Sequence, residues 1–276
     1  MKKILTLAAA GLVLASCNFG SGSGVVSTFL SALSAGTDAL TDIDGDTLLE
    51  LPAISDGDVI LRHEGYVTCY DPVAKIPVWV AYELTDEETR GEAGREESKF
   101  MMDPDYRGTQ AMREDYAGSG WTRGHMACAG DFHWDADALD ETFYLTNICP
   151  QNEELNGGDW NYLEKSVRRW ARENGSAWVV SGPIIGEGRY GKIGQRKVTV
   201  PDSFFKAVLV NGKGGWRSIA FVMDNDDKRY YLYDCSMSVN ELEKLTGLDF
   251  VPALPDDVEE AVEGTCRPRD WGIQAR

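Results

Sequence analysis

The sequence predicts an α+β fold in which a mainly antiparallel sheet is flanked by helices. Two observations indicate this class. Short runs of β-branched and aromatic residues recur along the chain, and glycine-containing turns join some of them into hairpins. One long amphipathic helix separates the early runs from the late ones. Hairpins build antiparallel sheets, and such a helix needs a sheet face to cover its apolar side.

The N-terminus predicts export. Lys2 and Lys3 precede an apolar run over residues 4–15, the pattern of a secretory signal. The stretch "LASC" that ends at Cys17 resembles a bacterial lipobox, which implies lipidation of that thiol; an ordinary signal peptide is the alternative. We therefore expect a signal peptide over residues 1–16, a lipidated, flexible tether over 17–58 and one domain over 59–276. The protein would be an exported cell-envelope lipoprotein, held to the membrane by its lipid.

The first expected strands form a hairpin. Residues 78–84 alternate between apolar and polar types, and residues 65–71 just before them read as the partner strand. Residues 85–100 are highly charged and predict an irregular segment.

The long helix is expected to start at Asp159, a good N-cap, and to run to about residue 174. Glu164 and Arg168, four residues apart, stand together at the edge of its apolar stripe. The stripe itself consists of Trp160, Leu163, Val167, Trp170 and Ala171.

The remaining elements follow the helix. Residues 176–185 predict a buried strand, and residues 203–210 and 216–223 flank "NGKGG", which is typical of a hairpin turn. A last helix over 238–247 opens with Ser-x-x-Glu, a capping box, and closes on Gly247.

Composition limits the function. The net charge of −18 argues against a protein that coats nucleic acid by bulk attraction, although residues 160–200 are locally basic. No CxxC spacing occurs, which argues against a cysteine zinc site. Only three histidines are present, so a multi-histidine metal cluster is nearly excluded as well.

One stretch, "WTRGHMACAGDF" over residues 121–132, begins a series of ordered motifs. The series comprises Arg123-Gly124-His125, Asn147-Ile148-Cys149-Pro150-Gln151, Leu155-Asn156, Trp160, Leu163-Glu164 and Arg168. It resembles the DNA/RNA non-specific endonucleases, which include secreted bacterial nucleases and mitochondrial endonuclease G. The resemblance covers about residues 60–272 and implies a ββα-metal nuclease core. The chain departs from the family at Thr122, where the family has Asp, and at Cys128, where a small Pro is usual.

The resemblance implies a metal-dependent, sequence-non-specific endonuclease that cleaves DNA or RNA through contacts with the phosphate backbone. His125 would be the general base, since a neutral imidazole suits that role. Asn156 would be the single protein ligand of Mg²⁺, with Mn²⁺ as a possible substitute, and Glu164 would hold metal-bound waters. Gly124 would permit a tight backbone turn. Further residues expected to contribute are Arg123, Arg168 and Arg95 on phosphate, Asn147 on the His125 loop or the substrate, and Gln151 and Arg169 on the substrate.

Secreted members of that family carry a late bridge similar to a Cys235–Cys266 disulfide, which the resemblance therefore implies here. Two other functions stay open from the sequence. One is an envelope lipoprotein that binds nucleic acid and has little catalytic activity. The other is a hydrolase that uses Cys128 or Cys149 with His125.

Overall fold

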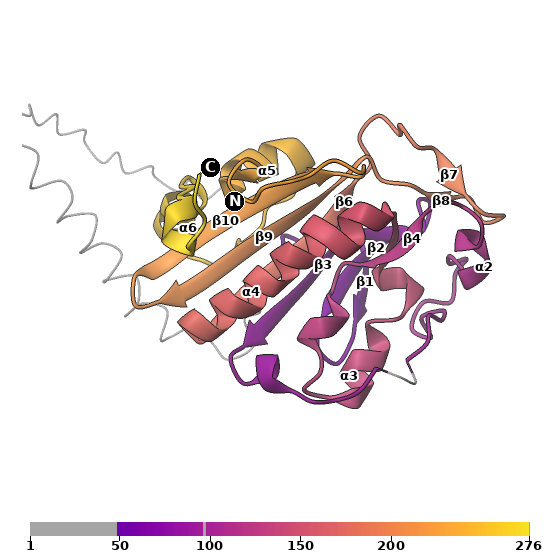
Figure 1. The fold of residues 1–276 in the computed structure, drawn as a ribbon, viewed down its shortest axis with the longest axis horizontal. Helices are drawn as coiled ribbons and strands as arrows, with labels where there is room; N and C mark the ends of the chain where they lie inside the picture. The colour runs from indigo at the N-terminus through magenta and orange to yellow at the C-terminus, as the bar shows by residue number, and fades with distance from the viewer. Residues whose placement is uncertain (1–48, 96–97, 276) are drawn as a thin grey trace, which may run out of the picture.

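The computed structural model describes residues 49–95 and 98–275, and its centre is a seven-stranded sheet in the order β1-β2-β3-β6-β9-β10-β11 (Figure 1). Every neighbouring pair is antiparallel. The α+β class with a mainly antiparallel sheet is confirmed. The expected signal peptide, the lipidation site Cys17 and most of the tether lie outside the described residues. The strands are β1 (Val59–Arg62), β2 (Val67–Asp71), β3 (Ile76–Thr85), β6 (Ser176–Ile184), β9 (Ser203–Gly212), β10 (Gly215–Asp224) and β11 (Ser236–Met237).

Both expected hairpins are present. β2 pairs with β3, and β9 pairs with β10 over ten residues each, from Gly212↔Gly215 to Ser203↔Asp224. Gly215 has φ +80°, a left-handed conformation that glycine adopts without steric cost. The short edge strands β1 and β11 were not anticipated, because neither carries a clear alternating pattern.

The long helix α4 (Asn161–Asn174) lies across one face of the sheet (Figure 1). It buries Leu163, Val167 and Trp170, as the stripe predicted. The expected cap at Asp159 is wrong, because the helical segment starts near residue 153 and passes through a wider π-helical turn, η5 (Leu155–Trp160), at Gly157–Gly158. The Asn152 side chain accepts backbone N–H bonds of residues 154 and 155 at this start.

The opposite face of the sheet is covered by α5 (Val239–Thr246), while α6 (Asp256–Glu263) packs against β10. The Ser238–Glu241 capping box and the left-handed Gly247 at the end of α5 are confirmed. Leu49 and Leu51 also pack against these clusters, so residues 49–51 of the expected tether lie against the folded domain.

A second, two-stranded sheet stands apart from the main one. β4 (Thr122–His125) pairs antiparallel with β5 (Ile148–Gln151), and α4 follows β5 in the chain, which gives a ββα unit. This unit holds most of the motif residues. The remaining short elements are η2 (Glu88–Arg90), α2 (Arg113–Tyr116), η3 (Ala129–Asp131), α3 (Ala136–Glu141), η4 (Leu145–Asn147), β7 (Lys192–Ile193), β8 (Val198–Thr199) and η6 (Pro268–Trp271).

Two further expectations concern cysteines and membranes. The five cysteines of the described chain are free thiols, so the implied Cys235–Cys266 bridge is not formed in the structure. Across the described residues, no helix combines the length and the apolar character needed to span a bilayer.

Candidate active site

Six of the predicted site residues line one open cavity of about 350 Å³ beside the ββα unit. β4 supplies Arg123 and His125, while α4 supplies Glu164 and Arg168. The π-helical turn η5 supplies Asn156, and Arg95 comes from the loop after η2. Residues that are 73 positions apart in sequence thus meet at one place, as the motif order predicted.

His125 lies in an aromatic and cationic surrounding. Its ring centroid is 5.4 Å from that of Phe100 and 5.0 Å from that of Phe143. The guanidinium groups of Arg123 and Arg95 lie over the same two phenyl rings, 4.5 Å and 5.4 Å from their centroids. Burial, and then the charges of Arg95 and Arg123, lower the pKa of His125 to about 3. The imidazole is therefore neutral at pH 7.

The Nε2 atom of His125 is buried and makes no hydrogen bond within the described residues. Buried polar atoms are nearly always paired, so one without a partner at a cavity is ready to bind an incoming group. A neutral imidazole nitrogen in that position can accept a proton from a water molecule.

Gly124 is needed for close approach, which corrects the expected tight turn. It sits in the middle of β4 opposite Cys149. A Cβ atom there would lie 2.0 Å from the side-chain oxygen of Gln151. Gln151 itself is fully buried under β4. It does not line the cavity, and its expected contact with substrate stays a prediction.

Asn147 holds the chain just after His125. Its Oδ1 accepts the N–H of Ala127 at 2.7 Å, and its Nδ2 donates to the carbonyls of Ala127 at 3.0 Å and of Thr142 at 2.7 Å. The side chain is fully buried. Of its two expected roles, the structure gives it the first: Asn147 positions the His125 loop and does not touch the cavity.

Thr122, the departure from the family motif, fixes the orientation of Asn156. The Thr122 hydroxyl donates to the carbonyl of Gln151 at 2.8 Å, so it can only accept from Asn156. It does so from Asn156 Nδ2 at 3.0 Å. The amide oxygen is thereby left without a hydrogen bond from the described residues.

Arg168 and Glu164 belong to a buried charge network. Arg168 donates to Asp131, with which it forms an ion pair, and to Cys128 Sγ at 3.4 Å. Tyr82 donates to the other Asp131 oxygen at 2.7 Å. Burial raises the pKa of Glu164 to about 6, and the positive charge of nearby Lys206 opposes that rise. Because Nη1 of Arg168 already donates to Asp131 and Cys128, only the other nitrogens of its guanidinium group are left for a ligand.

Sequence reasoning missed Asp131, Tyr82 and Lys206. Lys206 is 1% exposed and lies 4.8 Å from the centroid of the Trp160 ring. It donates to Ser181, its neighbour across the β6–β9 ladder. The sequence did contain a signal for Lys206: it is the single charged residue of the apolar strand "SFFKAVLV". A charged side chain in a buried strand indicates polar partners nearby, because an unpaired buried charge costs much free energy.

Arg169 does not line this cavity, and its expected contact with substrate stays a prediction. It points from the exposed side of α4 toward a neighbouring cavity of about 520 Å³ that Tyr162 and Arg229 also line.

The two cysteines near His125 have the wrong ionisation for a nucleophile. Burial raises the pKa of the Cys128 and Cys149 thiols well above the usual range, so neither is a thiolate at neutral pH. This argues against the cysteine hydrolase.

The oxygen donors of the cavity fit a hard divalent cation. Within the described part of the chain, Asn156 Oδ1 accepts no hydrogen bond and the amide is oriented by Thr122, and Glu164 lines the same cavity. Oxygen ligands of this kind suit Mg²⁺, which keeps several of its waters and accepts few protein ligands.

Comparisons of the sequence with known proteins find similarity to nucleases. A model of the DNA/RNA non-specific endonuclease family matches residues 45–257. The mitochondrial nuclease EXOG of Xenopus laevis is 40% identical over 211 residues, which cover 71% of this chain and 59% of the relative. Human mitochondrial endonuclease G is 36% identical over 204 residues, 69% of each chain. The chain thus spans about six tenths of the length of the EXOG relatives that it matches.

The fold comparison agrees. A crystal structure of the EndoG/EndoGI complex, described as showing the mechanism of EndoG inhibition, superposes with a TM-score of 0.69 and 28% identity, over 74% of this chain and 89% of that one. The ββα-metal core is therefore confirmed. The predicted location is contradicted: the similar nucleases EXOG and endonuclease G are mitochondrial proteins and not envelope lipoproteins.

Proposed function

The chain belongs to the DNA/RNA non-specific endonuclease family, and on that premise we propose that it is a metal-dependent endonuclease that hydrolyses phosphodiester bonds in DNA or RNA without sequence specificity. The observation that carries the proposal is His125. It is a neutral imidazole whose Nε2 has no hydrogen-bond partner among the described residues, and it lines a cavity together with Arg95, Arg123 and Asn156.

The chemistry follows from these positions. His125 Nε2 takes a proton from water as that water attacks phosphorus and the bond between phosphorus and the leaving sugar oxygen breaks; the leaving oxygen then takes a proton from solvent. General-base help of this kind contributes typically about 10²–10⁴-fold to rate. Because the imidazole stays neutral far below pH 7, its base form is fully available at physiological pH. Asn147, through its three hydrogen bonds, keeps the loop after His125 in one place during that transfer.

Asn156 Oδ1 would hold the metal ion directly, and Glu164 would hold its bound waters. We propose Mg²⁺, with Mn²⁺ as a substitute, which when bound stabilises negative charge on the phosphoryl and leaving oxygens. The orientation of the Asn156 amide by Thr122 supports this role, because it directs the oxygen and not the nitrogen to a ligand.

Substrate contacts are expected to be with phosphates. Arg95 and Arg123 face the cavity with no carboxylate paired to them among the described residues, and the guanidinium fork suits phosphate oxygens. Contacts of this kind position nucleic acid without reading its bases, which supports a lack of sequence specificity.

The test is nicking of supercoiled plasmid by the purified full chain in Mg²⁺, with and without chelator. We expect relaxed and linear DNA in Mg²⁺ and none with chelator. Asn156→Leu should need far more metal than Asn156→Asp, which keeps an oxygen of the same reach. Plasmid that stays supercoiled under Mg²⁺ and Mn²⁺, together with gel retardation of that plasmid, would contradict the proposal and favour a binding protein.

A further inference from the structure

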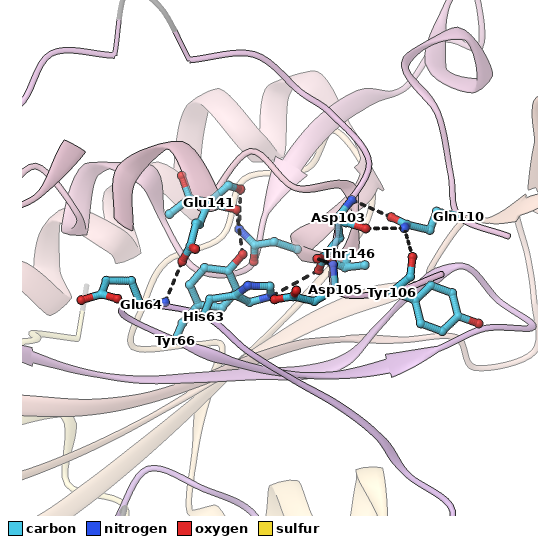
Figure 2. Close-up of polar contacts among 11 residues, drawn as sticks. His63, Glu64, Tyr66, Asp103, Asp105, Tyr106, Gln110, Glu141 and Thr146 are labelled. Atoms are coloured by element: carbon cyan, nitrogen blue, oxygen red, sulfur yellow. Dashed lines mark hydrogen bonds and ion pairs between the residues drawn. The ribbon is translucent and has the colours of Figure 1, made fainter. Parts of the chain in front are cut away.

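A second cluster of potential metal ligands lies outside the candidate active site. His63 follows β1 in the turn to β2, whereas Asp103 and Asp105 belong to the loop before α2. One ligand atom from each of the three residues lies within 4.8 Å of the other two. Figure 2 shows the His63 ring and the two carboxylates gathered at one point.

Among the described residues, the histidine of this cluster makes an ion-pair contact with Asp103 but no hydrogen bond of good geometry. The His63 side chain is fully buried, and neither ring nitrogen meets the geometry of a hydrogen bond, although Nε2 lies 3.3 Å from Asp103 Oδ2. Two atoms bound to one ion at about 2.0–2.1 Å with tetrahedral angles stand about 3.3–3.5 Å apart. The separation of these two atoms, which is that of an ion pair, also matches that of two ligands on a shared cation.

The cluster is held in place by its surroundings. The His63 ring packs against Tyr66 and Tyr144, with centroids 4.4 Å and 5.5 Å away. Thr146 donates to Asp103 Oδ2 at 2.5 Å, so the carboxylate that faces His63 is oriented by a neighbour. The Gln110 side chain binds both backbone polar groups of Asp103, at 2.8 Å and 2.7 Å.

The third potential ligand, Asp105, lies at the solvent-exposed side of the cluster, from which a metal ion could enter. Asp105 is exposed, and its backbone N–H donates to Asp103 Oδ1 at 2.9 Å. An exposed carboxylate can rotate toward an ion held by two buried ligands, and water can complete the coordination. One imidazole nitrogen with two carboxylates suits a first-row divalent cation better than Mg²⁺, which prefers oxygen alone.

We propose that His63, Asp103 and Asp105 form a second metal site, separate from the active site, that takes a first-row divalent cation such as Zn²⁺. The site would tie the β1–β2 turn to the loop before α2. Its role would be structural, because the histidine and one carboxylate are buried and only Asp105 is exposed to solvent.

The experiment titrates the full chain with Zn²⁺ by calorimetry in excess Mg²⁺, with thermal unfolding as a second readout. We expect one Zn²⁺ to bind the wild-type cluster and to raise the melting temperature. Asp105→Asn, a surface change that preserves size, should weaken that binding at least tenfold and abolish the thermal shift. Thr146→Val should weaken it about 10–100-fold, as loss of a group that orients a ligand does.

The controls separate this cluster from the other possible ligands. Asp137→Asn makes the same change at an exposed carboxylate of α3 and should bind Zn²⁺ as the wild type does. His125→Ala should also bind it, which separates the proposal from the nuclease function. Equal Zn²⁺ affinity in wild type, Asp105→Asn and His63→Gln would overturn the proposal and leave His63–Asp103 as an ion pair only; so would the absence of any Zn²⁺-dependent thermal shift in the wild type.

Discussion

Two histidines of this chain sit in opposite electrostatic surroundings. His125 faces two guanidinium groups across aromatic rings, and its pKa is lowered to about 3 by burial and by those charges. His63 faces carboxylates, packed between two tyrosines. Cations keep an imidazole neutral, with its nitrogen lone pair free, whereas anions favour a proton or a metal ion on it. The surroundings, not the residue, decide which role a histidine takes.

The two regions nevertheless share one element. Thr146 and Asn147 are consecutive residues of η4: Thr146 donates to Asp103 beside His63, whereas Asn147 holds Ala127 after His125. A short helical turn thus supports both regions from neighbouring positions. We expect the two regions to work separately in spite of this common support.

The largest effect is expected from His125→Ala. The variant should lose about 10²–10⁴-fold in plasmid-cleavage rate, because no other described group in the cavity offers a neutral nitrogen to take the proton. Its binding of DNA and of metal should be unchanged, since Asn156 and the arginines remain. Rates from single-turnover cleavage, with DNA binding measured in chelator, check both parts. Near wild-type cleavage would remove His125 from its proposed role.

The next effect concerns Thr122, which orients the metal-binding amide. Thr122→Val keeps the shape of the side chain but removes the hydroxyl that bonds Asn156 and Gln151. We expect the Mg²⁺ concentration for half-maximal rate to rise about 10–100-fold. Thr122→Ser keeps the hydroxyl and serves as the matched control. Identical metal dependence of the two variants would show that Thr122 does not set the orientation of Asn156.

The site residues could be predicted from sequence through the resemblance to the nuclease family, and local spacing agrees with it for part of the site. Helical periodicity alone places Glu164 and Arg168 on one edge of α4, and the order of the motifs located Asn156 just before it. The class of the fold followed from hairpin turns in the same way, since a hairpin is also a local pattern.

The parts that escaped prediction depend on contacts between distant segments. Lys206 lies beside Ser181 because of the register in which β9 pairs with β6. The residue pattern of either strand does not predict which residues of the two strands will be paired. The Arg168–Asp131 pair spans 37 positions, and His63 meets Asp103 from 40 positions away across a loop without periodicity. The start of α4 was misplaced because Asp159 looks like a cap, whereas the glycines beside it permit a π-helical turn.

A smaller effect is expected at Arg95. Arg95→Met removes one of the two charges that keep His125 neutral, so the pKa of His125 should rise from about 3, by about one unit. The unfolded imidazole titrates near pH 6.5, so the unfolded state binds more protons between about pH 6.5 and 3. Wild-type stability is therefore lost as the pH falls through this window, and less so in Arg95→Met. NMR titration of the imidazole tests this, with Arg169→Met as the control. Protonation of wild-type His125 near pH 6.5 would contradict the account.

The smallest effect is expected from His63→Gln on catalysis. Among the described residues, the printed contacts of His63 are with residues outside the catalytic cavity, so we expect His63→Gln to change the cleavage rate by no more than about twofold, the size of the coupling of about 0.5 kcal/mol found between separated sites. Asn147→Asp is the informative contrast, because it keeps the acceptor for Ala127 N–H but removes the donor to two carbonyls, and it should slow cleavage well beyond twofold. Initial plasmid-nicking rates at 25 °C compare the two variants. If His63→Gln slowed cleavage as much as Asn147→Asp, η4 would transmit the state of one region to the other, and the two histidines would have to be treated as one coupled system.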